Sequence, residues 1–321
     1  MRPKTLARRL IPGLLFGFVV FLGLSIVGDL RQVGAQVLGF RWGYFPAVIA
    51  LTLFNYTLRW VKFHYYLGQV GLRSFPRRQS LRLFVAGFPL AMTPGKVGEM
   101  LKGVWIEQKT GLPAARGVAV VLAERISDGL AVLLLSLAGV IAYPSYWPAF
   151  AAILGILLGV IVISQLPPLA NFFLMVGERL PLLGGIMVHL RNFYEGSYSL
   201  FRPLSTMIAI GLGAVSWLGE GIGMYLILLG LGVEGGWLSL SIAVFTLSFS
   251  TVVGGVSALP GGLGAAEASI AGMLVLLLGL ASETAAAATL LIRFATLWFG
   301  VSLGLVTWLF SPDLLRMSEV K

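Results

Sequence analysis

The chain has 321 residues, of which 58% are hydrophobic and only 11% are charged, and its mean hydropathy is +0.92. A soluble domain of this size does not need so much apolar surface, and residues 129–177 and 235–266 carry no charge. The sequence therefore predicts an all-α polytopic membrane protein, because its apolar runs are continuous and lack the alternation of a β-barrel.

Residues that support metal, thiol or nucleic-acid chemistry are scarce. The chain has no cysteine and two distant histidines, His64 and His189, so we expect neither disulfides nor a thiolate or multi-histidine metal site. The net charge of +10 indicates loop charge that sets membrane topology, helped by contact with anionic lipid, rather than nucleic-acid binding. No cofactor, metal or nucleic-acid partner is predicted.

Six apolar segments are long enough to be full membrane spans. The first follows a basic start, and because it lacks a small-x-small cleavage site we expect an uncleaved helix rather than a signal peptide. We place the spans at about 11–28, 46–67, 116–142, 149–166, 204–231 and 284–310.

A seventh segment, at about 80–106, is broken in the middle by Thr93-Pro94-Gly95. Each arm has roughly 10–14 residues, or about 15–21 Å of helix, which is too short to cross a hydrocarbon core of about 30 Å. We therefore expect a re-entrant hairpin. The helix after the break starts at about Lys96, and its free N–H groups, its dipole and Lys96 favour a bound anion. Glu99, one turn on, can cap this helix, pair with Lys96 or carry a proton.

The stretch at about 167–203 is apolar with scattered charge. It is typical of an amphipathic helix lying in the cytoplasmic membrane interface, and the alternative is a solvated linker.

A second broken segment, at about 238–280, repeats the plan of the first. Its break is Leu259-Pro260-Gly261-Gly262, followed by Glu267. Its arms are longer, roughly 16–20 residues, so we expect a re-entrant hairpin with two tilted full spans as the alternative. Since it has no lysine, an anion there would depend on backbone amides or on a basic residue such as Arg293.

Lys and Arg are distributed unequally between the two sides of this arrangement. With the N-terminus inside, fifteen fall on the cytoplasmic side and two, Arg31 and Arg41, outside. The positive-inside rule then puts both termini in the cytoplasm, and the two hairpins open from opposite sides, as in an inverted repeat. We expect residues 1–321 to form one transmembrane domain in the inner (cytoplasmic) cell membrane.

Charged residues at membrane depth are costly, so they are candidates for function or for buried ion pairs. Glu124 and Asp128 share one helix face and can pair with Lys96, Lys102 or Arg59, relay protons, or lie near a wet interface. Arg59 and Lys62 can reach water if their long side chains snorkel to the cytoplasmic interface. Glu220 lies in the middle of its span, so among the acids it is the hardest to explain in this way. The full set is Arg59, Lys62, Lys96, Glu99, Lys102, Glu124, Arg125, Asp128, Glu220, Glu267 and Arg293.

Three motifs resemble the signature of a known family. They are Thr93-Pro94-Gly95-Lys96-Val97-Gly98-Glu99 with Lys102, Glu124-Arg125-Ile126-Ser127-Asp128, and Leu259-Pro260-Gly261-Gly262-Leu263-Gly264 with Glu267. In this order they are similar to the lysylphosphatidylglycerol synthase transmembrane family, also called the flippase-like or UPF0104 family, over about residues 10–310.

This resemblance implies movement of lipid between leaflets. Fused members carry a cytosolic aminoacyltransferase that this sequence lacks, so we expect a standalone member without lipid aminoacylation. Expected substrate-binding residues are Thr93, Pro94, Gly95, Lys96, Gly98, Glu99, Lys102, Arg59, Arg125, Pro260, Gly261, Gly262, Gly264, Glu267 and Arg293. Glu124, Asp128 and Glu220 are expected to couple protons or ions, or to form structural ion pairs.

The favoured function is a flippase for an anionic lipid of the phospholipid or polyprenyl-phosphate type. Its headgroup would bind at the two opposed half-helix N-termini near the midplane. The alternatives are a transporter of a small anionic solute or ion, and a lipid-binding membrane subunit of a separate lipid-modifying enzyme or glycosyltransferase. An enzyme is not expected, because no nucleophile or metal constellation is present.

Overall fold

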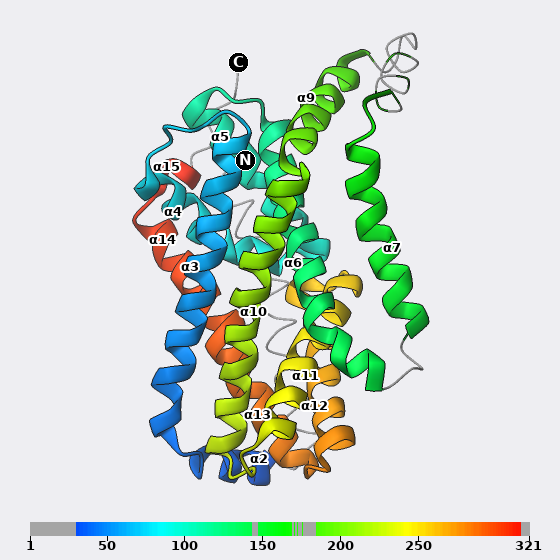
Figure 1. Cartoon of the computed structure of the whole chain (residues 1–321). Helices are drawn as coiled ribbons and strands as arrows, with labels where there is room; N and C mark the ends of the chain where they lie inside the picture. The colour runs from blue at the N-terminus through cyan, green and yellow to red at the C-terminus, as the bar shows by residue number, and fades with distance from the viewer. Residues whose placement is uncertain are drawn as a thin grey trace.

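The computed structural model describes residues 30–142, 147–168, 170, 172, 175 and 184–315, and these contain helices and turns but no strand. The helices form an elongated bundle (Figure 1). In chain order they are α2 Leu30–Leu38, η1 Trp42–Tyr44, α3 Phe45–Gln69, α4 Arg77–Ala86, η2 Phe88–Met92, η3 Pro94–Met100, α5 Leu101–Thr110, α6 Ala114–Ala142, α7 Trp147–Ser164, α9 Gly184–Leu200, α10 Pro203–Gly230, α11 Trp237–Val256, η5 Pro260–Gly262, α12 Ala265–Leu278, α13 Ser282–Arg293, η6 Phe294–Trp298 (a π-helical turn), α14 Phe299–Leu309 and α15 Pro312–Leu315.

The prediction of an all-α polytopic membrane protein is confirmed. Within the described ranges, five helical segments are long and apolar enough to cross a membrane: 147–164, 203–230, 237–256, 260–278 and 282–309. A sixth appears if 31–38 and 42–69, bent by 64°, count as one span. The predicted spans at 46–67, 149–166, 204–231 and 284–310 match helices within a few residues, and α6 matches 116–142. The span predicted at 11–28 lies outside the described residues.

Both predicted breaks are present. Helix α4 ends at Ala86 and α5 begins at Leu101, with ten residues in each, and both helices lie toward the upper end of Figure 1. The second segment instead has arms of 20 and 19 residues, each long enough to span. Its outer ends join α10 and α13 at the lower end of Figure 1. That length favours the alternative of two tilted spans, while a re-entrant path for either segment stays a prediction.

Of the predicted interfacial segment, the structure describes mainly α9, which packs on the start of α6. Gly196 of α9 lies against α6, since a Cβ added to Gly196 would be 3.1 Å from the Cβ of Ala119. Arg116 and Glu195 also form an ion pair between the two helices. Contact of α9 with a lipid surface stays a prediction.

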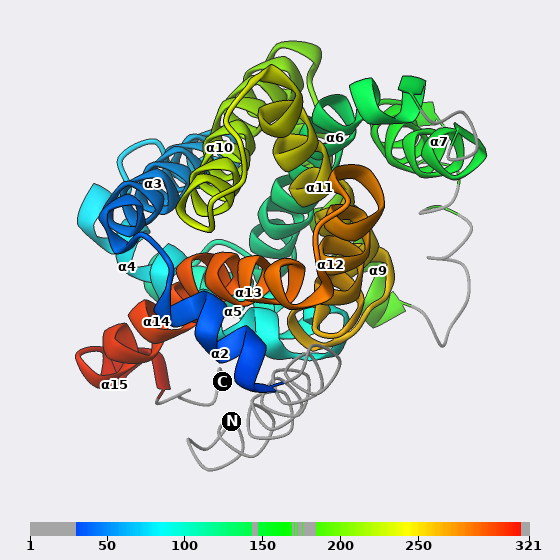
Figure 2. The same cartoon turned by 90° about the horizontal axis from the view of Figure 1, so that it is seen from below.

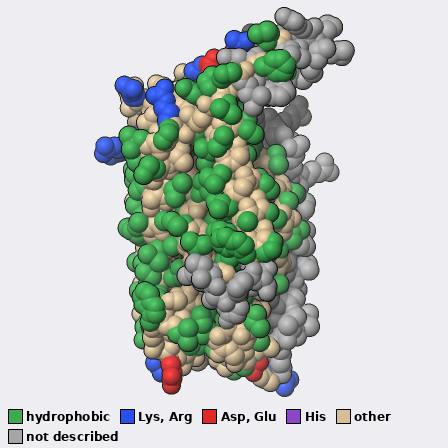
Figure 3. Space-filling view, turned by 45° about the vertical axis from the view of Figure 1, so that its right-hand side comes forward, with side chains coloured by type: hydrophobic (Ala, Val, Ile, Leu, Met, Phe, Trp, Pro, Cys, Tyr) green, Lys and Arg blue, Asp and Glu red, His purple; other side chains and the backbone are tan. Residues whose placement is uncertain are grey.

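The outer surface fits a membrane environment. On the face drawn in Figure 3, Lys, Arg, Asp and Glu gather at the two ends, and the side between them is largely apolar. Helix α7 is the extreme case, because only 11% of its span is buried while its hydropathy is 2.3. Figure 2 shows α7 at the outer edge of the bundle, beside α6.

Helices α5 and α6 approach each other unusually closely. A Cβ on Gly117 would lie 2.6 Å from the Cα of Gly103, and a Cβ on Gly103 would lie 2.7 Å from the carbonyl oxygen of Ala114. Small residues at such a crossing let two backbones pack directly, which is how helices associate where no hydrophobic effect drives them together. The crossing fixes the short arm that follows the first break.

An ion pair lies inside the same crossing. The Nζ of Lys102 is 3.0 Å from Oε2 of Glu124, and the two side chains are 3% and 0% exposed. The ammonium also lies 5.3 Å from the ring centre of Phe63. Since each charge is removed from water, each depends on the other.

We predict that Gly117→Ala destabilises the protein by about 1–3 kcal/mol, because the added methyl overlaps the backbone of α5. Thermal unfolding of purified protein in detergent measures this as a lower apparent midpoint. The matched control is Gly159→Ala on α7, where a Cβ meets nothing within 4 Å. Equal midpoints for the two variants would contradict a tight crossing.

We also predict that Glu124→Gln destabilises the protein by about 3–5 kcal/mol, because it leaves the Lys102 ammonium buried without its countercharge. The double variant Lys102→Met/Glu124→Gln is expected to recover most of the loss in the same unfolding measurement. A double variant as unstable as the single one would show that the pair is not what stabilises this crossing.

Candidate functional site

A cavity of about 500 Å³ lies where the two broken segments meet. Its wall is built by segments that are far apart in the sequence, mainly α3, η3, α6, α7, α10, α11, α12 and the end of α13. The volume falls in the range of small-ligand sites in proteins, roughly 300–1,000 Å³. The breaks therefore create a space rather than a simple bend.

The first break turns through a left-handed backbone. Gly95 and Lys96 have φ of 59° and 56°, and Lys96 is one of two non-glycine residues with positive φ among those described. The Thr93 hydroxyl accepts a hydrogen bond from the N–H of Gly98 at 2.8 Å and donates one to the Leu90 carbonyl at 2.7 Å. The side chain of Thr93 thus holds the turn together.

The second break is joined to the first through its backbone. The N–H of Gly95 donates to the carbonyl of Ala258 at 2.7 Å, and Ala258 also has a positive φ, 54°. The tips fit closely, since a Cβ on Gly261 would lie 2.9 Å from the sulfur of Met92. This contact brings Lys96 next to the second segment.

The N-terminus of α12 is already capped by the chain itself. The Glu267 carboxylate accepts from the N–H of Gly264 at 2.6 Å, and its other oxygen is 2.5 Å from Nε of Arg293. Arg293 also donates to the Gly261 carbonyl at 3.0 Å. Glu267 therefore takes one N–H of the expected second anion site and pairs with Arg293, while anion binding at this N-terminus stays a prediction.

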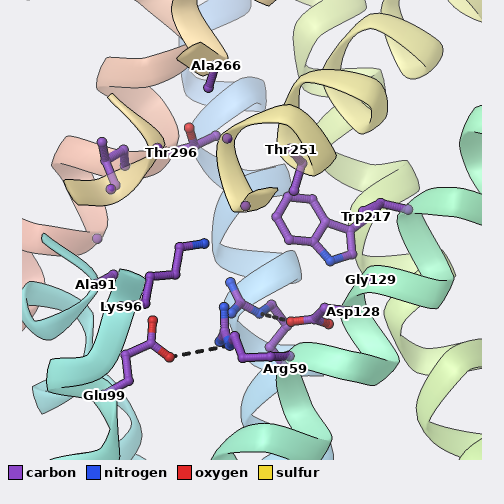
Figure 4. Close-up of a pocket in the computed structure, with 18 of the residues that line it drawn as sticks. Arg59, Ala91, Lys96, Glu99, Asp128, Gly129, Trp217, Thr251, Ala266 and Thr296 are labelled. Carbon is purple, nitrogen blue, oxygen red and sulfur yellow. Dashed lines mark ion pairs between the residues drawn. The ribbon is translucent and has the colours of Figure 1, made fainter. Parts of the chain in front are cut away.

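Two longer ion pairs line the cavity. Nε of Arg125 is 3.3 Å from Glu99, and Nε of Arg59 is 3.4 Å from Asp128 (Figure 4). Both Nε atoms are buried and make no hydrogen bond. Asp128 pairs in addition with Lys62, whose side chain is fully buried. The idea that Arg59 and Lys62 snorkel to the interface is therefore replaced by pairing with Asp128.

Lys96 differs from the other bases of the cavity. Arg59, Lys102, Arg125 and Arg293 each have a carboxylate partner, whereas the ammonium of Lys96 has no ion pair or hydrogen bond within the part of the chain that the structure describes. Figure 4 shows its side chain extending into the space between η3 and Thr251. Lys96 therefore presents an uncompensated ammonium to the cavity.

The cavity has more bases than acids. Its lining has the bases Arg59, Lys96, Lys102, Arg125 and Arg293 and the acids Glu99, Asp128 and Glu220. Lys62, Glu124 and Glu267 pair with these residues from behind the wall, so six bases against five acids leave a formal surplus of one positive charge. Glu220 is 5% exposed and has no ion pair with any described residue. Such a wall favours an anion.

The structure brings most of the expected site residues together. The cavity is lined by Gly95, Lys96, Glu99, Lys102, Arg59, Arg125, Gly261, Gly262, Arg293, Asp128 and Glu220. The remaining candidates, Thr93, Pro94, Gly98, Pro260, Gly264, Glu267 and Glu124, shape the breaks or form buried pairs behind the wall. A direct role for this second group in binding stays a prediction.

Sequence reasoning missed Trp217 and Tyr56. The ring of Trp217 lies 5.6 Å from the guanidinium carbon of Arg59, and its buried indole N–H has no hydrogen-bond partner. Tyr56 donates its hydroxyl to the Thr296 carbonyl. An aromatic residue within an apolar helix carries no distinguishing signal. Trp217 could have been found only from its place one turn before Glu220.

In the described part of the chain, no group of three or more His, Asp or Glu is arranged to hold a metal ion. The cavity can bind a ligand through charge-assisted hydrogen bonds from the guanidinium groups of Arg59 and Arg125 and from the unpaired ammonium of Lys96. These groups suit a phosphate or carboxylate ligand.

Comparison with known proteins agrees with the motifs. Residues 14–304 match the family described as the lysylphosphatidylglycerol synthase TM region. The chain is 28% identical over 249 residues to a UPF0104 membrane protein of Methanothermobacter thermautotrophicus, covering 71% of each chain. It is 29% identical over 180 residues to another of Methanocaldococcus jannaschii, covering 55% of this chain and 74% of that one.

No solved structure gives a significant match. The family match nevertheless spans most of the sequence, including both breaks and every charged residue that lines the cavity. The chain therefore belongs to the lysylphosphatidylglycerol synthase transmembrane family.

Proposed function

We propose that this protein moves an anionic lipid between membrane leaflets, with the lipid phosphate bound at Lys96. The unpaired Lys96 ammonium, in a cavity with surplus positive charge, is the observation that carries the proposal. Lys96 is partly exposed. An ammonium at membrane depth without a partner is costly, so it is expected to be compensated by a ligand for part of the working cycle.

The two long ion pairs support the same assignment. Arg59 and Arg125 keep unused hydrogen-bond donors toward Asp128 and Glu99 at 3.4 and 3.3 Å. A phosphate has enough acceptor oxygens to take bonds from both guanidinium groups and from Lys96. The carboxylates then neutralise the bases while the site is empty, and the phosphate replaces part of that role when it binds.

The remaining assignments follow from this one. We place the protein in the cytoplasmic membrane, with the end of the bundle rich in Lys and Arg toward the cytoplasm. The protein moves its lipid without altering it covalently, and a separate lipid-modifying enzyme or glycosyltransferase makes or uses that lipid. Glu220 is the acid that we assign to proton coupling, because it is buried in the cavity wall without an ion pair to the described residues.

We predict that Lys96→Gln lowers leaflet exchange of a phosphate-bearing lipid by about tenfold or more, since a charge-assisted hydrogen bond contributes about 1.5–3 kcal/mol. Lys96→Arg should retain much of the activity. The measurement is exchange of fluorescent phosphatidylglycerol, and of a polyprenyl phosphate, in proteoliposomes.

The matched control is Lys109→Gln, which alters a lysine paired with Asp313 at 2.7 Å, away from the cavity. It should leave exchange unchanged. Equal exchange by wild type and Lys96→Gln would contradict phosphate binding at Lys96. Electrogenic flux of a small anion without lipid exchange would favour a solute transporter instead.

A further inference from the structure

The cavity has two chemically different parts. The charged part is formed by α3, η3, α10, α13 and the first half of α6. The other part lies between α6, α7 and the end of α11 and carries no charged side chain; Ser250 and Thr251 of α11, which also line the cavity, are its polar neighbours. Its lining residues are Val132, Ile153, Leu157, Val252, Gly255 and Val256. A ligand that fills both parts must itself be polar at one end and apolar at the other.

The apolar part opens at the side of the bundle. Val256 lines the cavity and is nevertheless 67% exposed. A Cβ placed on Gly255 would meet no atom within 4 Å, so nothing in the described chain covers this position. Helix α7, which lies at the edge of the bundle in Figure 2, contributes Ile153 and Leu157 to this part of the wall. Leu157 rests on α6, since a Cβ placed on Gly129 would lie 3.0 Å from the Cδ1 of Leu157.

The opposite side of the cavity is closed. The ring of Tyr56 packs 4.7 Å from that of Phe88, and its hydroxyl bonds the Thr296 carbonyl. A Cβ on Gly300 would lie 2.5 Å from the Tyr56 hydroxyl oxygen, so no free path is left between α3 and α14. A chain leaving the cavity sideways therefore has the α7–α11 side available to it.

We propose that the opening between α7 and the end of α11 holds the hydrocarbon chain of the transported lipid while its phosphate contacts Lys96. This lateral opening is defined by Ile153, Leu157, Val252, Gly255 and Val256. The inference rests on the proposed function and deepens it. It specifies a lipid whose hydrocarbon chain stays in an apolar environment throughout, since exposing that chain to water is unfavourable. A tailless anion would use only the charged part.

The test is to fill the opening with Gly255→Trp. Exchange of fluorescent phosphatidylglycerol in proteoliposomes should fall about tenfold or more, because the indole occupies the space of the lipid chain. Binding of glycerol 3-phosphate, the tailless headgroup fragment, to purified protein should change less than about twofold.

The matched control is Gly272→Trp on α12. Gly272 is also a helical glycine where an added Cβ would meet no atom within 4 Å, and it does not line the cavity. It should leave exchange unchanged. Unchanged exchange in Gly255→Trp, with exchange still lost in Lys96→Gln, would overturn the lateral opening and leave the proposed function standing.

A second measurement tests whether a lipid chain occupies the lateral opening, and it does not depend on lipid exchange by the wild-type protein. Phosphatidylglycerol with a photoreactive diazirine in its acyl chain should label the peptides that contain residues 153–157 and 252–256, and Gly255→Trp should abolish that labelling. Labelling confined to other lipid-facing surfaces, with the same pattern in both proteins, would overturn the opening. Absence of exchange by wild type would overturn the proposed function by itself.

Discussion

Backbone hydrogen bonding in a hydrocarbon environment constrains this molecule more than any other interaction. A helix broken inside a membrane exposes N–H and C=O groups that neither lipid nor water can satisfy, so the break must lie within protein. Here the two breaks partly satisfy each other, because the N–H of Gly95 bonds the carbonyl of Ala258. Pro94 and Pro260 further reduce the number of backbone groups that need a hydrogen-bond partner at the breaks, since proline has no N–H.

The arrangement of charges follows from that junction. The left-handed turn that allows the Gly95 bond also directs Lys96 into the space beside the junction. Acids on neighbouring segments neutralise the other bases of the cavity, some tightly, as in Glu267 with Arg293, and some loosely, as in Glu99 with Arg125. Tight pairs hold elements in place, whereas loose pairs leave donors that a ligand can use.

Hydropathy and the Pro-Gly breaks were enough to predict the spanning helices and the place of both interruptions. Both signals act locally: a long apolar run forms a helix in lipid, and a proline followed by glycine ends one. The pairing of Glu124 with Lys102 was among the alternatives that helical spacing allowed. Local signals could not show that α12 would cap itself with Glu267, because a carboxylate one turn into a helix is equally suited to pair elsewhere.

The remaining features depend on how distant segments pack. Snorkelling was a reasonable expectation for Lys62, but α6 brings Asp128 within reach of it. Likewise, Trp217 enters the site only because α10 packs beside α3 and places its ring over Arg59. Contacts of this kind are decided by helix crossings such as that of Gly103 and Gly117, which a single sequence does not reveal.

The proposed function depends on contact between a lipid phosphate and the Lys96 ammonium. The most direct measurement is solid-state NMR of dipolar coupling between ¹⁵N at lysine Nζ and ³¹P of the lipid, on protein in phosphatidylglycerol bilayers. A Lys96→Arg sample identifies the contribution of this one lysine by difference. We expect a coupling that corresponds to an N–P separation within about 4 Å in the wild type and that is absent from the variant. Identical spectra for the two proteins would contradict it.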